Sequence, residues 1–345
     1  MGIAFKDLIK GKEISLEDLS GKKLMIDAHN NLYQYLTTIR QRDGTPLMDS
    51  KGRVTSHLVG VFNRTTRLMQ SNIMPAFVFD GEAPELKKKE RERRKASKIE
   101  AQKKYEDAVK KEDTEAMKKY ASRTSRLTSD IIEESKKIID ALGLPIIQAP
   151  SEGEAQAAHI VKKGEAFATV SQDFDTLLYG TQKLVKNLSI AGKRKKAGTS
   201  IYQTISPEII DLTETLNALG IDNNQLIALA MLVGTDYNRE GVKGIGPKNA
   251  LKLVKKHGAD FDNLFEEVKW KEHFELPWTD VYYLFKKMPV TDDYKLEWKQ
   301  PDWEKLSKLL VEEHDFSQAR VNSAKEKLTK NKESKQQKGL GEFFK

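Results

Sequence analysis

The chain has 345 residues, of which 38% are hydrophobic, so it is long enough to bury one large core or two smaller ones. It contains no cysteine, which excludes disulfides, thiolate catalysis and cysteine-bound zinc. Its formal net charge of +8 favours a polyanionic partner, either nucleic acid or an acidic membrane surface. Since no apolar run approaches the ~20 residues of a membrane-spanning helix, and no signal peptide or lipid anchor is recognised, we expect no membrane association.

Three short apolar runs, each followed by an aspartate, are predicted to be buried strands. They are 24–26 before Asp27, 77–79 before Asp80, and 167–170 shortly before Asp173. Segments of helical periodicity lie between them, and this alternation predicts an α/β fold with a mostly parallel central sheet flanked by helices. In such a sheet the ligand site lies beyond the carboxyl ends of the strands, where these aspartates would emerge.

The composition changes over 82–130, where charged residues and alanine dominate and bulky apolar residues are few. This segment favours helix but has too little apolar surface for a core, so we expect it to project from the body as a helical arch. Its part 87–98 holds eight bases and two acids. Most charge runs of this kind are solvated helix faces. Because this run begins soon after Asp80, we favour the interpretation that it guides DNA over the metal site.

A set of acids stands at the strand ends and in two closely spaced pairs. These candidate metal ligands are Asp27, Asp80, Glu152, Glu154, Asp173, Asp175 and Asp236. Some have simpler explanations, because Ser151 and Glu154 match a capping box, and Asp175 and Asp236 could each cap a helix. Taken singly, the capping interpretation is favoured. Taken together, the acids favour a metal site, because the sheet would bring them to one edge.

Clustered carboxylates repel one another, and divalent cations remove that conflict. Ligation by oxygen alone suits Mg²⁺, with Mn²⁺ as a substitute, better than Zn²⁺. Two such ions can clamp a phosphodiester, so that no protein nucleophile is required. His29 lies two residues after Asp27, but none of the six histidines has a ligand-pair spacing, and we expect His29 to be structural or peripheral.

A glycine-rich turn at 241–250 enters a predicted helix and is followed by several lysines. Backbone amides at such a turn, with the positive end of the helix behind them, bind phosphate without reading its base. We interpret 234–258 as a helix-hairpin-helix element with Gly244, Gly246 and Lys248 at the DNA, although an ordinary turn between two helices is the alternative. Tyr33, on the helix after Asp27, could stack on a base.

With these residues in hand, the chain closely resembles the flap endonucleases of archaea and eukaryotes, within the structure-specific 5′-nuclease superfamily. The resemblance runs along the whole chain, and its set of motifs in this order is highly specific. The matching segments are 1–3, Ile26-Asp27-Ala28, Val78-Phe79-Asp80-Gly81, 149–155, Ser171-Gln172-Asp173-Phe174-Asp175 and Gly234-Thr235-Asp236-Tyr237.

The resemblance implies roles for individual residues and two metal ions in each molecule. The first ion would be held by Asp27, Asp80, Glu152 and Glu154, and the second by Asp173, Asp175 and Asp236, some through water. Arch residues Lys87 and Arg94 would contact the scissile phosphate. Further DNA contacts would fall on Tyr33, Arg40, Arg64, Glu152, Gly234 and Asp236, and a K⁺ ion often accompanies the helix-hairpin-helix. Relatives often carry smaller residues at 88–90, so this chain departs from the family pattern beside Lys87. The metal ligands are therefore better supported than the choice of Lys87 over its neighbours.

The end of the chain, 337–344, fits the pattern Gln-x-x-Leu-x-x-Phe-Phe, which resembles sliding-clamp (PCNA) ligands. A short turn there would place Leu340, Phe343 and Phe344 on one apolar knob, with Gln337 in a polar pocket of the partner. The polar stretch before it, from 326, is predicted to be a flexible tail. The alternative is a hydrophobic end that folds back onto its own body.

We therefore expect a nuclease domain over 1–325 and a clamp-binding tail over 326–345. The domain would comprise an N-terminal part (1–98), the arch (82–130) and an internal part (131–258). The expected activity is structure-specific cutting of 5′ flaps with 5′–3′ exonuclease activity, in Okazaki-fragment maturation and long-patch base excision repair. The alternatives are a sister nuclease for bubbles, gaps or four-way junctions, or a non-catalytic scaffold. The enzyme would be monomeric and cytoplasmic at an archaeal nucleoid, or nuclear in a eukaryote.

Overall fold

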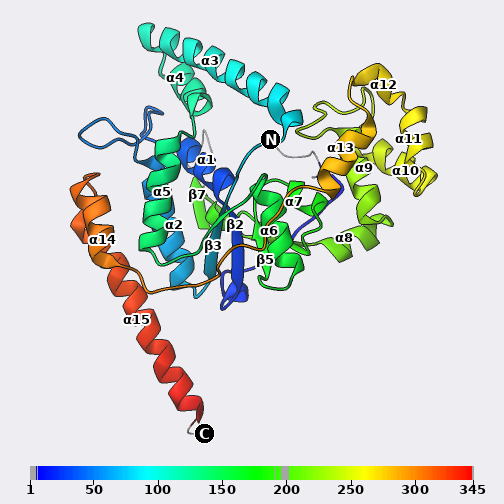
Figure 1. Ribbon diagram of the computed structural model, residues 1–345. Coiled ribbons are helices and arrows are strands. Elements are labelled where there is room, and N and C mark those ends of the chain that lie inside the picture. Colours follow the sequence, from blue (N-terminus) through cyan, green and yellow to red (C-terminus); the bar gives the residue numbers. More distant parts are fainter. Residues whose placement is uncertain (1–4, 6, 191, 196–201, 344–345) are drawn as a thin grey trace.

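The computed structural model describes residues 5, 7–190, 192–195 and 202–343. Figure 1 shows a central sheet with helices packed on both of its faces. Two helices, α3 and α4, stand above the sheet as an arch, and the long helix α15 leads away from the body on the opposite side. The expected α/β class is confirmed.

The main sheet has the strand order β1-β9-β6-β5-β2-β3-β4. Its five strands from β6 to β4 run parallel, whereas β9 pairs antiparallel with both β6 and β1. The predicted, mostly parallel sheet is therefore correct, with an antiparallel edge added. A separate hairpin is formed by β7 and β8. The strands are β1 (Lys12–Glu13), β2 (Lys23–Asp27), β3 (Met74–Phe79), β4 (Ile146–Gln148), β5 (Ala168–Val170), β6 (Lys183–Lys186), β7 (Gly192–Lys195), β8 (Tyr202–Ile205) and β9 (Glu208–Asp211).

Strand β2 lies in the middle of the sheet and is buried on both faces. Leu24 and Ile26 belong to the core under one layer of helices, whereas Met25 belongs to the core on the other face. This alternation follows from the two-residue period of a strand. The first layer contains α1 (Ala28–Thr38), α2 (Ser56–Gln70) and α5 (Ser129–Ala141), and the second contains α6 (Gly153–Lys162).

A helical unit follows the sheet in sequence and has its own core. Helix α9 lies at its centre, and its residues from Leu226 to Leu232 are fully buried. No single described helix is long and apolar enough to cross a membrane; the bent pair α8 and α9 meets that test by length and composition only. The unit comprises α7 (Asp175–Leu178), α8 (Leu212–Leu219), α9 (Asn223–Val233), α10 (Pro247–His257), α11 (Phe261–Glu267), α12 (Trp270–His273) and α13 (Trp278–Lys286).

The arch consists of α3 (Lys88–Lys110) and α4 (Thr114–Ala121), preceded by a short 3₁₀ turn at Glu85–Lys87. Most of α3 is exposed, and its buried residues are Glu90, Ala101 and Ala108. The arch therefore projects from the body for the expected reason, since it carries too few apolar side chains to be drawn into a core.

An extended segment, 290–302, runs from α13 to α14 (Trp303–Ser307), and we call it the strap. It is joined to the body by hydrogen bonds from Thr291 to Gln156, from Trp298 to the carbonyl of Pro75, and from Lys299 to the carbonyl of Gly143. Lys23, the first residue of β2, lies over the Trp298 ring. The strap thus crosses the amino ends of β2 and β3.

The C-terminal segment is helical where the sequence predicted a flexible tail, and its flexibility stays a prediction. Helix α15 (Gln318–Phe343) follows a π-helical turn at Lys308–Glu312 and continues through 326, where flexibility was predicted. Lysine, glutamate and glutamine are good helix formers, so a polar segment without a core can still be helical. Asn331 in addition donates a hydrogen bond to the carbonyl of Gln70 at 2.8 Å.

Candidate active site

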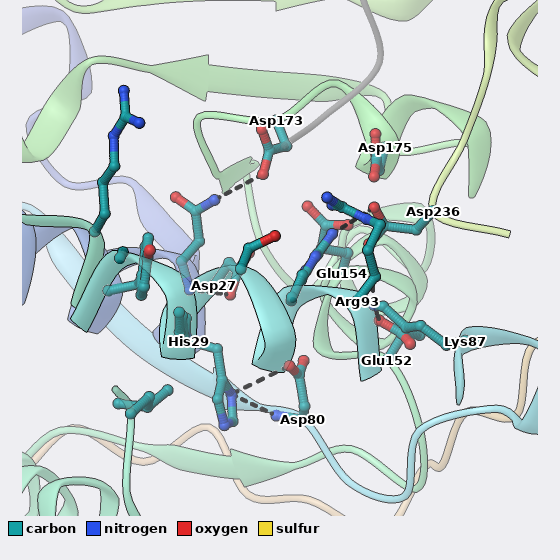
Figure 2. A pocket seen from close by; sticks show the side chains of 18 of the residues that line it. Asp27, His29, Asp80, Lys87, Arg93, Glu152, Glu154, Asp173, Asp175 and Asp236 are labelled. Carbon is teal, nitrogen blue, oxygen red and sulfur yellow. Dashed lines mark hydrogen bonds and ion pairs between the residues drawn. The ribbon is translucent and has the colours of Figure 1, made fainter. Parts of the chain in front are cut away.

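All seven acids singled out in the sequence line one cavity of about 830 Å³ at the carboxyl ends of the parallel strands (Figure 2). Asp27 ends β2, Asp80 follows β3, and Asp173 lies three residues beyond β5. The cavity continues upward under the arch, where Ser97 and Lys104 of α3 also line it. The parallel topology explains why residues far apart in the sequence meet here.

Asp27 is the most enclosed of the aspartates, with 6% of its surface exposed. It caps α1, because its carboxylate accepts a hydrogen bond from the backbone N–H of Asn30 at 3.0 Å. Asn30 in turn donates its side-chain amide to Asp173 at 3.0 Å. Burial, together with repulsion from Asp80, raises the pKa of Asp27 to about 8.

Asp80 is held by the start of α6 and by a histidine. The backbone N–H of Gly153 donates to Asp80 Oδ1 at 2.7 Å. The Nδ1 atom of His29 accepts from the backbone N–H of Asp80 at 3.1 Å, and its ring packs edge-on against Phe79. His29 therefore orients the backbone beside the acid, which agrees with its expected peripheral role.

Glu152 and Glu154 lie at the first turn of α6, but the expected capping box is wrong. Glu152, rather than Ser151, is the N-cap residue, and no side chain caps the helix. The Ser151 hydroxyl instead donates to the carbonyl of Glu82 at 2.8 Å. Burial raises the pKa of both glutamates, and for Glu154 repulsion from Asp175 adds to the effect.

The capping alternative also fails for the remaining acids. Asp175 is the first residue of α7, whose N-cap is Phe174. Asp236 lies between α9 and α10, and no described helix begins there. Helix capping therefore does not explain these positions, whereas Asp27 does cap a helix, which the sequence did not indicate.

Two cations from the base of the arch reach into the acids. Lys87 Nζ lies 2.6 Å from Glu152 and 3.5 Å from Asp236, and Figure 2 shows it beside Glu152. Arg94 pairs with Asp236 at 2.6 Å. Burial disfavours the charged form of Lys87, but the charge of Glu152 outweighs it and raises the Lys87 pKa above its ordinary value.

The donor set fits divalent cations with a preference for oxygen. Buried carboxylates with raised pKa values face one cavity, and positive charge is what would keep them ionised together. Among the described residues, no three acidic or histidine side chains already have the spacing of a formed metal site. In this structure Lys87 and Arg94 contribute the balancing charge.

Comparison with known protein families gives two matches along this site. The XPG N-terminal domain matches residues 1–101, and the XPG I-region matches residues 143–236. Together they contain all seven acids and leave 102–142, which includes the outer part of the arch and α5, between them.

Curated relatives match over almost the entire chain. Flap endonuclease 1 of Pyrococcus abyssi is 50% identical over 344 residues, which cover 100% of this chain and 98% of that protein. Flap endonuclease 1 of Staphylothermus marinus is 49% identical over 96% of this chain and 95% of that protein. The chain belongs to the flap endonuclease family.

Solved structures agree with this assignment. The flap endonuclease-1 from Methanococcus jannaschii is 43% identical, covers 97% of this chain and 100% of its own, and superposes with a TM-score of 0.74. The catalytic core of Rad2 in complex with DNA substrate has a TM-score of 0.68 at 24% identity, and it shows a shared fold. The fold of this chain is thus shared with this more distant protein.

In this flap endonuclease Tyr33 is 39% exposed and lines the cavity. Lys98 of the arch lies over its ring, with Nζ 5.1 Å from the centroid. The tyrosine predicted to stack on a base therefore meets the arch in this structure. An incoming base would have to displace Lys98.

Arg40 and Arg64, predicted to contact DNA, are both engaged with their own chain. Arg40 donates to the carbonyls of Leu36 at 2.9 Å and Gly44 at 2.7 Å. Arg64 donates to the carbonyl of Ser189 at 2.9 Å. Neither belongs to the residues that line the carboxylate cavity. Both positions anchor loops beside α1 and α2, and their contact with DNA stays a prediction.

The predicted helix-hairpin-helix is formed by α9, the glycine-rich turn and α10. Gly246 caps α10 and Pro247 begins it, so the first amides of the helix have no side-chain cap. Gly244 has a φ of +85°, and nothing lies within 4 Å of where a side chain would begin. At Gly234 the φ of +116° and the nearby backbone of Gly241 require glycine. The turn is thus open at Gly244, and its binding to a phosphate backbone stays a prediction.

The residues predicted to bind a sliding clamp lie at the end of the chain. Gln337, Leu340 and Phe343 lie within α15, and Phe344 lies outside the described residues. Their binding to a clamp stays a prediction.

Several polar residues that contact the acids or the arch arginines were not apparent from the sequence. Asn30 holds Asp173, Ser171 donates to Glu154 at 3.2 Å, and Glu90 binds Arg94 at 2.7 Å. The spacing of Asn30, three residues after Asp27 on a predicted helix, was the one usable signal. The other two depend on how distant elements meet.

Proposed function

We propose that this chain hydrolyses the phosphodiester at the base of 5′ flaps, leaving a 5′ phosphate and a 3′ hydroxyl, and that it also has 5′–3′ exonuclease activity. The observation that carries the proposal is the gathering of seven acids in one cavity beneath a basic arch. The process would be Okazaki-fragment maturation and long-patch base excision repair, at the nucleoid of an archaeal-type cell.

Asp27, Asp80, Glu152 and Glu154 would hold one Mg²⁺ ion, and Asp173, Asp175 and Asp236 a second, with Mn²⁺ able to replace either. When bound, the two ions supply a nucleophilic water and stabilise charge on the leaving oxygen. The protein contributes an arrangement of acids that is fixed in advance. Asn30 orients Asp173, and the amide of Gly153 orients Asp80.

Lys87 and Arg94 would bind the scissile phosphate once the ions balance the acids. Both line the cavity, and both stand on the arch directly above Asp236 and Glu152. Tyr33 would stack on the base next to the cleaved bond, since its ring is partly exposed at the same cavity. Specificity would then depend on the shape of the branch, because none of these groups reads a base edge.

The turn at 234–246 and the start of α10 would grip the duplex through its phosphates, with Gly244, Gly246 and Lys248 closest and a K⁺ ion at the turn. A helix start with uncapped amides is suited to phosphate. Residues 337–345 would bind a sliding clamp, and the enzyme would act as a monomer on each branch.

The test is incision of a labelled double-flap substrate with and without Mg²⁺, beside a four-way junction and a blunt duplex. We expect Mg²⁺-dependent cutting near the flap base, with the other two as poor substrates. Preferred cutting of the junction would assign the chain to a sister activity. Tight binding without cutting by the unaltered protein would contradict the proposal.

A matched variant tests the second metal site. Asp175→Ala should abolish cutting and leave binding to branched DNA largely intact, because Asp175 lines the cavity but is not among the residues proposed to grip the duplex. Normal cutting by this variant would contradict the assignment of Asp175 to a metal.

A further inference from the structure

Glu90 is unusual among the charged residues of the arch. It lies in the first turn of α3, within a segment dominated by lysine and arginine, and only 7% of its surface is exposed. The other acid of this segment, Glu92, is exposed. A buried carboxylate normally has partners that repay its desolvation.

Those partners are two consecutive arginines. The Nε and Nη2 atoms of Arg93 both donate to Glu90 at 2.8 Å, and Nε of Arg94 donates to Glu90 Oε1 at 2.7 Å. The hydrogen bond from Arg93 is the main reason why the pKa of Glu90 falls to about 2. The carboxylate is therefore ionised at any working pH and holds both guanidinium groups.

Glu90 itself does not line the carboxylate cavity. It belongs to a neighbouring hollow of about 500 Å³, whose walls also include Trp270 and Phe274 of the helical unit. Arg94, in contrast, lines the carboxylate cavity and spans from Glu90 on one side to Asp236 on the other. Glu90 thus reaches the cavity through the two arginines that it holds, and of these Arg94 is the one that pairs with an acid of the cavity.

We propose that Glu90 is a positioning residue that fixes the Arg94 guanidinium for the scissile phosphate. This inference rests on the role of Arg94 in the proposed function. If Asp236 serves a metal ion, its hydrogen bond to Arg94 is weakened, and Glu90 becomes the support that remains. Without Glu90, the positive charges of Lys87 and Arg93 would repel Arg94 away from this position.

A simpler role for Glu90 would be to stabilise the start of α3, since an acid in the first turn favours a helix. The two roles predict different effects of replacing Glu90 when Arg94 is also replaced. A helix-stabilising acid acts independently of Arg94, whereas a positioning residue has no effect once Arg94 is absent.

The test is a double-mutant cycle on Glu90→Gln and Arg94→Ala, with single-turnover cutting and flap-DNA affinity measured for each. We expect Glu90→Gln to slow cutting by about 10-fold with unchanged affinity and melting temperature, because a misplaced guanidinium loses contact with the transition state. Arg94→Ala should slow cutting by about 100-fold, and the double variant should be no slower than Arg94→Ala alone.

Glu92→Gln is the control, since it removes the same charge from an exposed position on the same helix and should cut normally. Equal rates for Glu90→Gln and Glu92→Gln, or additive losses in the double variant, would overturn the inference while leaving the proposed function in place. A normal cutting rate for Arg94→Ala would instead contradict the proposed role of Arg94 at the scissile phosphate. The role of Glu90 as its positioning residue would then fail as well.

Discussion

Acids in the cavity are stabilised in different ways although they lie close together. Asp27 is a helix cap, Asp80 accepts a backbone N–H, and Glu152 pairs with Lys87. Each contact offsets part of the cost of gathering negative charge in a partly buried place. Two of the three contacts come from groups that do not titrate, so much of this arrangement persists when the acids change their protonation.

The raised pKa of Asp27 predicts how stability without divalent ions depends on pH. Between its ordinary value of 3.8 and about 8, the folded protein holds a proton that the unfolded chain has released. This contribution is complete below 3.8 and is lost as the pH rises through 8, so the melting temperature in EDTA should fall over that window. The glutamates at 152 and 154 act in the same direction.

Thermal melting between pH 5 and 8.5, with EDTA or with Mg²⁺, measures this effect. Stabilisation by Mg²⁺ should increase with pH, because the ion competes with protons for the same oxygens. In Asp27→Asn the dependence in EDTA should be flatter. A melting temperature in EDTA that rises over this window would contradict the prediction.

Gly153 is predicted to be essential for a reason of space. A Cβ atom there would lie 2.7 Å from Asp80 Oδ1, the oxygen that the Gly153 amide binds. Gly153→Ala should therefore displace Asp80 and lower activity by about 10- to 100-fold. Alanine favours the helix, so the melting temperature should not fall. A cutting rate and a Mg²⁺ dependence equal to those of the unaltered protein would contradict this prediction.

A residue of this site could be predicted only where the neighbouring sequence carries a recognisable pattern. Asp27 and Asp80 were found because acids follow short apolar runs, and a parallel sheet brings such positions to one edge. Glu90 was missed because its burial depends on the approach of the arch to the helical unit, which no local pattern reports. Arg40 was expected at DNA, and no local pattern indicated its hydrogen bonds to the carbonyls of Leu36 and Gly44.

At the scale of elements, the strands and the arch were predicted more reliably than the helix ends. Apolar runs identify buried strands, and a charged segment without apolar residues identifies a projection. The capping box at Ser151 failed because the turn after β4 directs that hydroxyl to the carbonyl of Glu82. For the polar stretch after 326 the sequence did not indicate the helix, because low hydrophobicity and high helix propensity coincide there. The flexibility of this stretch stays a prediction.

The helix-hairpin-helix element should bind duplex mainly by charge. Lys248→Ala should weaken duplex binding equally for different sequences and reduce the slope of log affinity against log salt by about 1. Titrations at several salt concentrations measure this slope. Lys295→Ala is the control, because Lys295 is an exposed base on the strap, at the opposite ends of the strands. The same loss in both variants would indicate a general effect of net charge.

At the scale of the whole molecule, the carboxylate cavity lies away from the end of the C-terminal helix, although the start of that helix packs on the body. Helix α15 leads away from the body on the side opposite the arch (Figure 1). The carboxylate cavity is complete without it, since residues up to 236 supply all seven acids.

Deleting 337–345 should therefore leave the cutting of naked flap DNA unchanged and remove stimulation by a sliding clamp. Cutting rates with and without the clamp, for the full chain and the truncated chain, measure both effects. A matched variant with Leu340→Ala and Phe343→Ala should behave like the deletion. Unchanged stimulation in either would contradict the proposed partner.

The strap is the part of the chain that joins the helical unit to the C-terminal helices. A partner holding the C-terminal helix and a duplex held at α10 would pull on segments that lie before and after the strap in the sequence. The segment 290–302 connects them behind the sheet, anchored at Gln156, Pro75 and Gly143. Tension would then act at the amino ends of β2 and β3. The acids at the other ends of those strands would keep their geometry while a partner moves the enzyme along DNA.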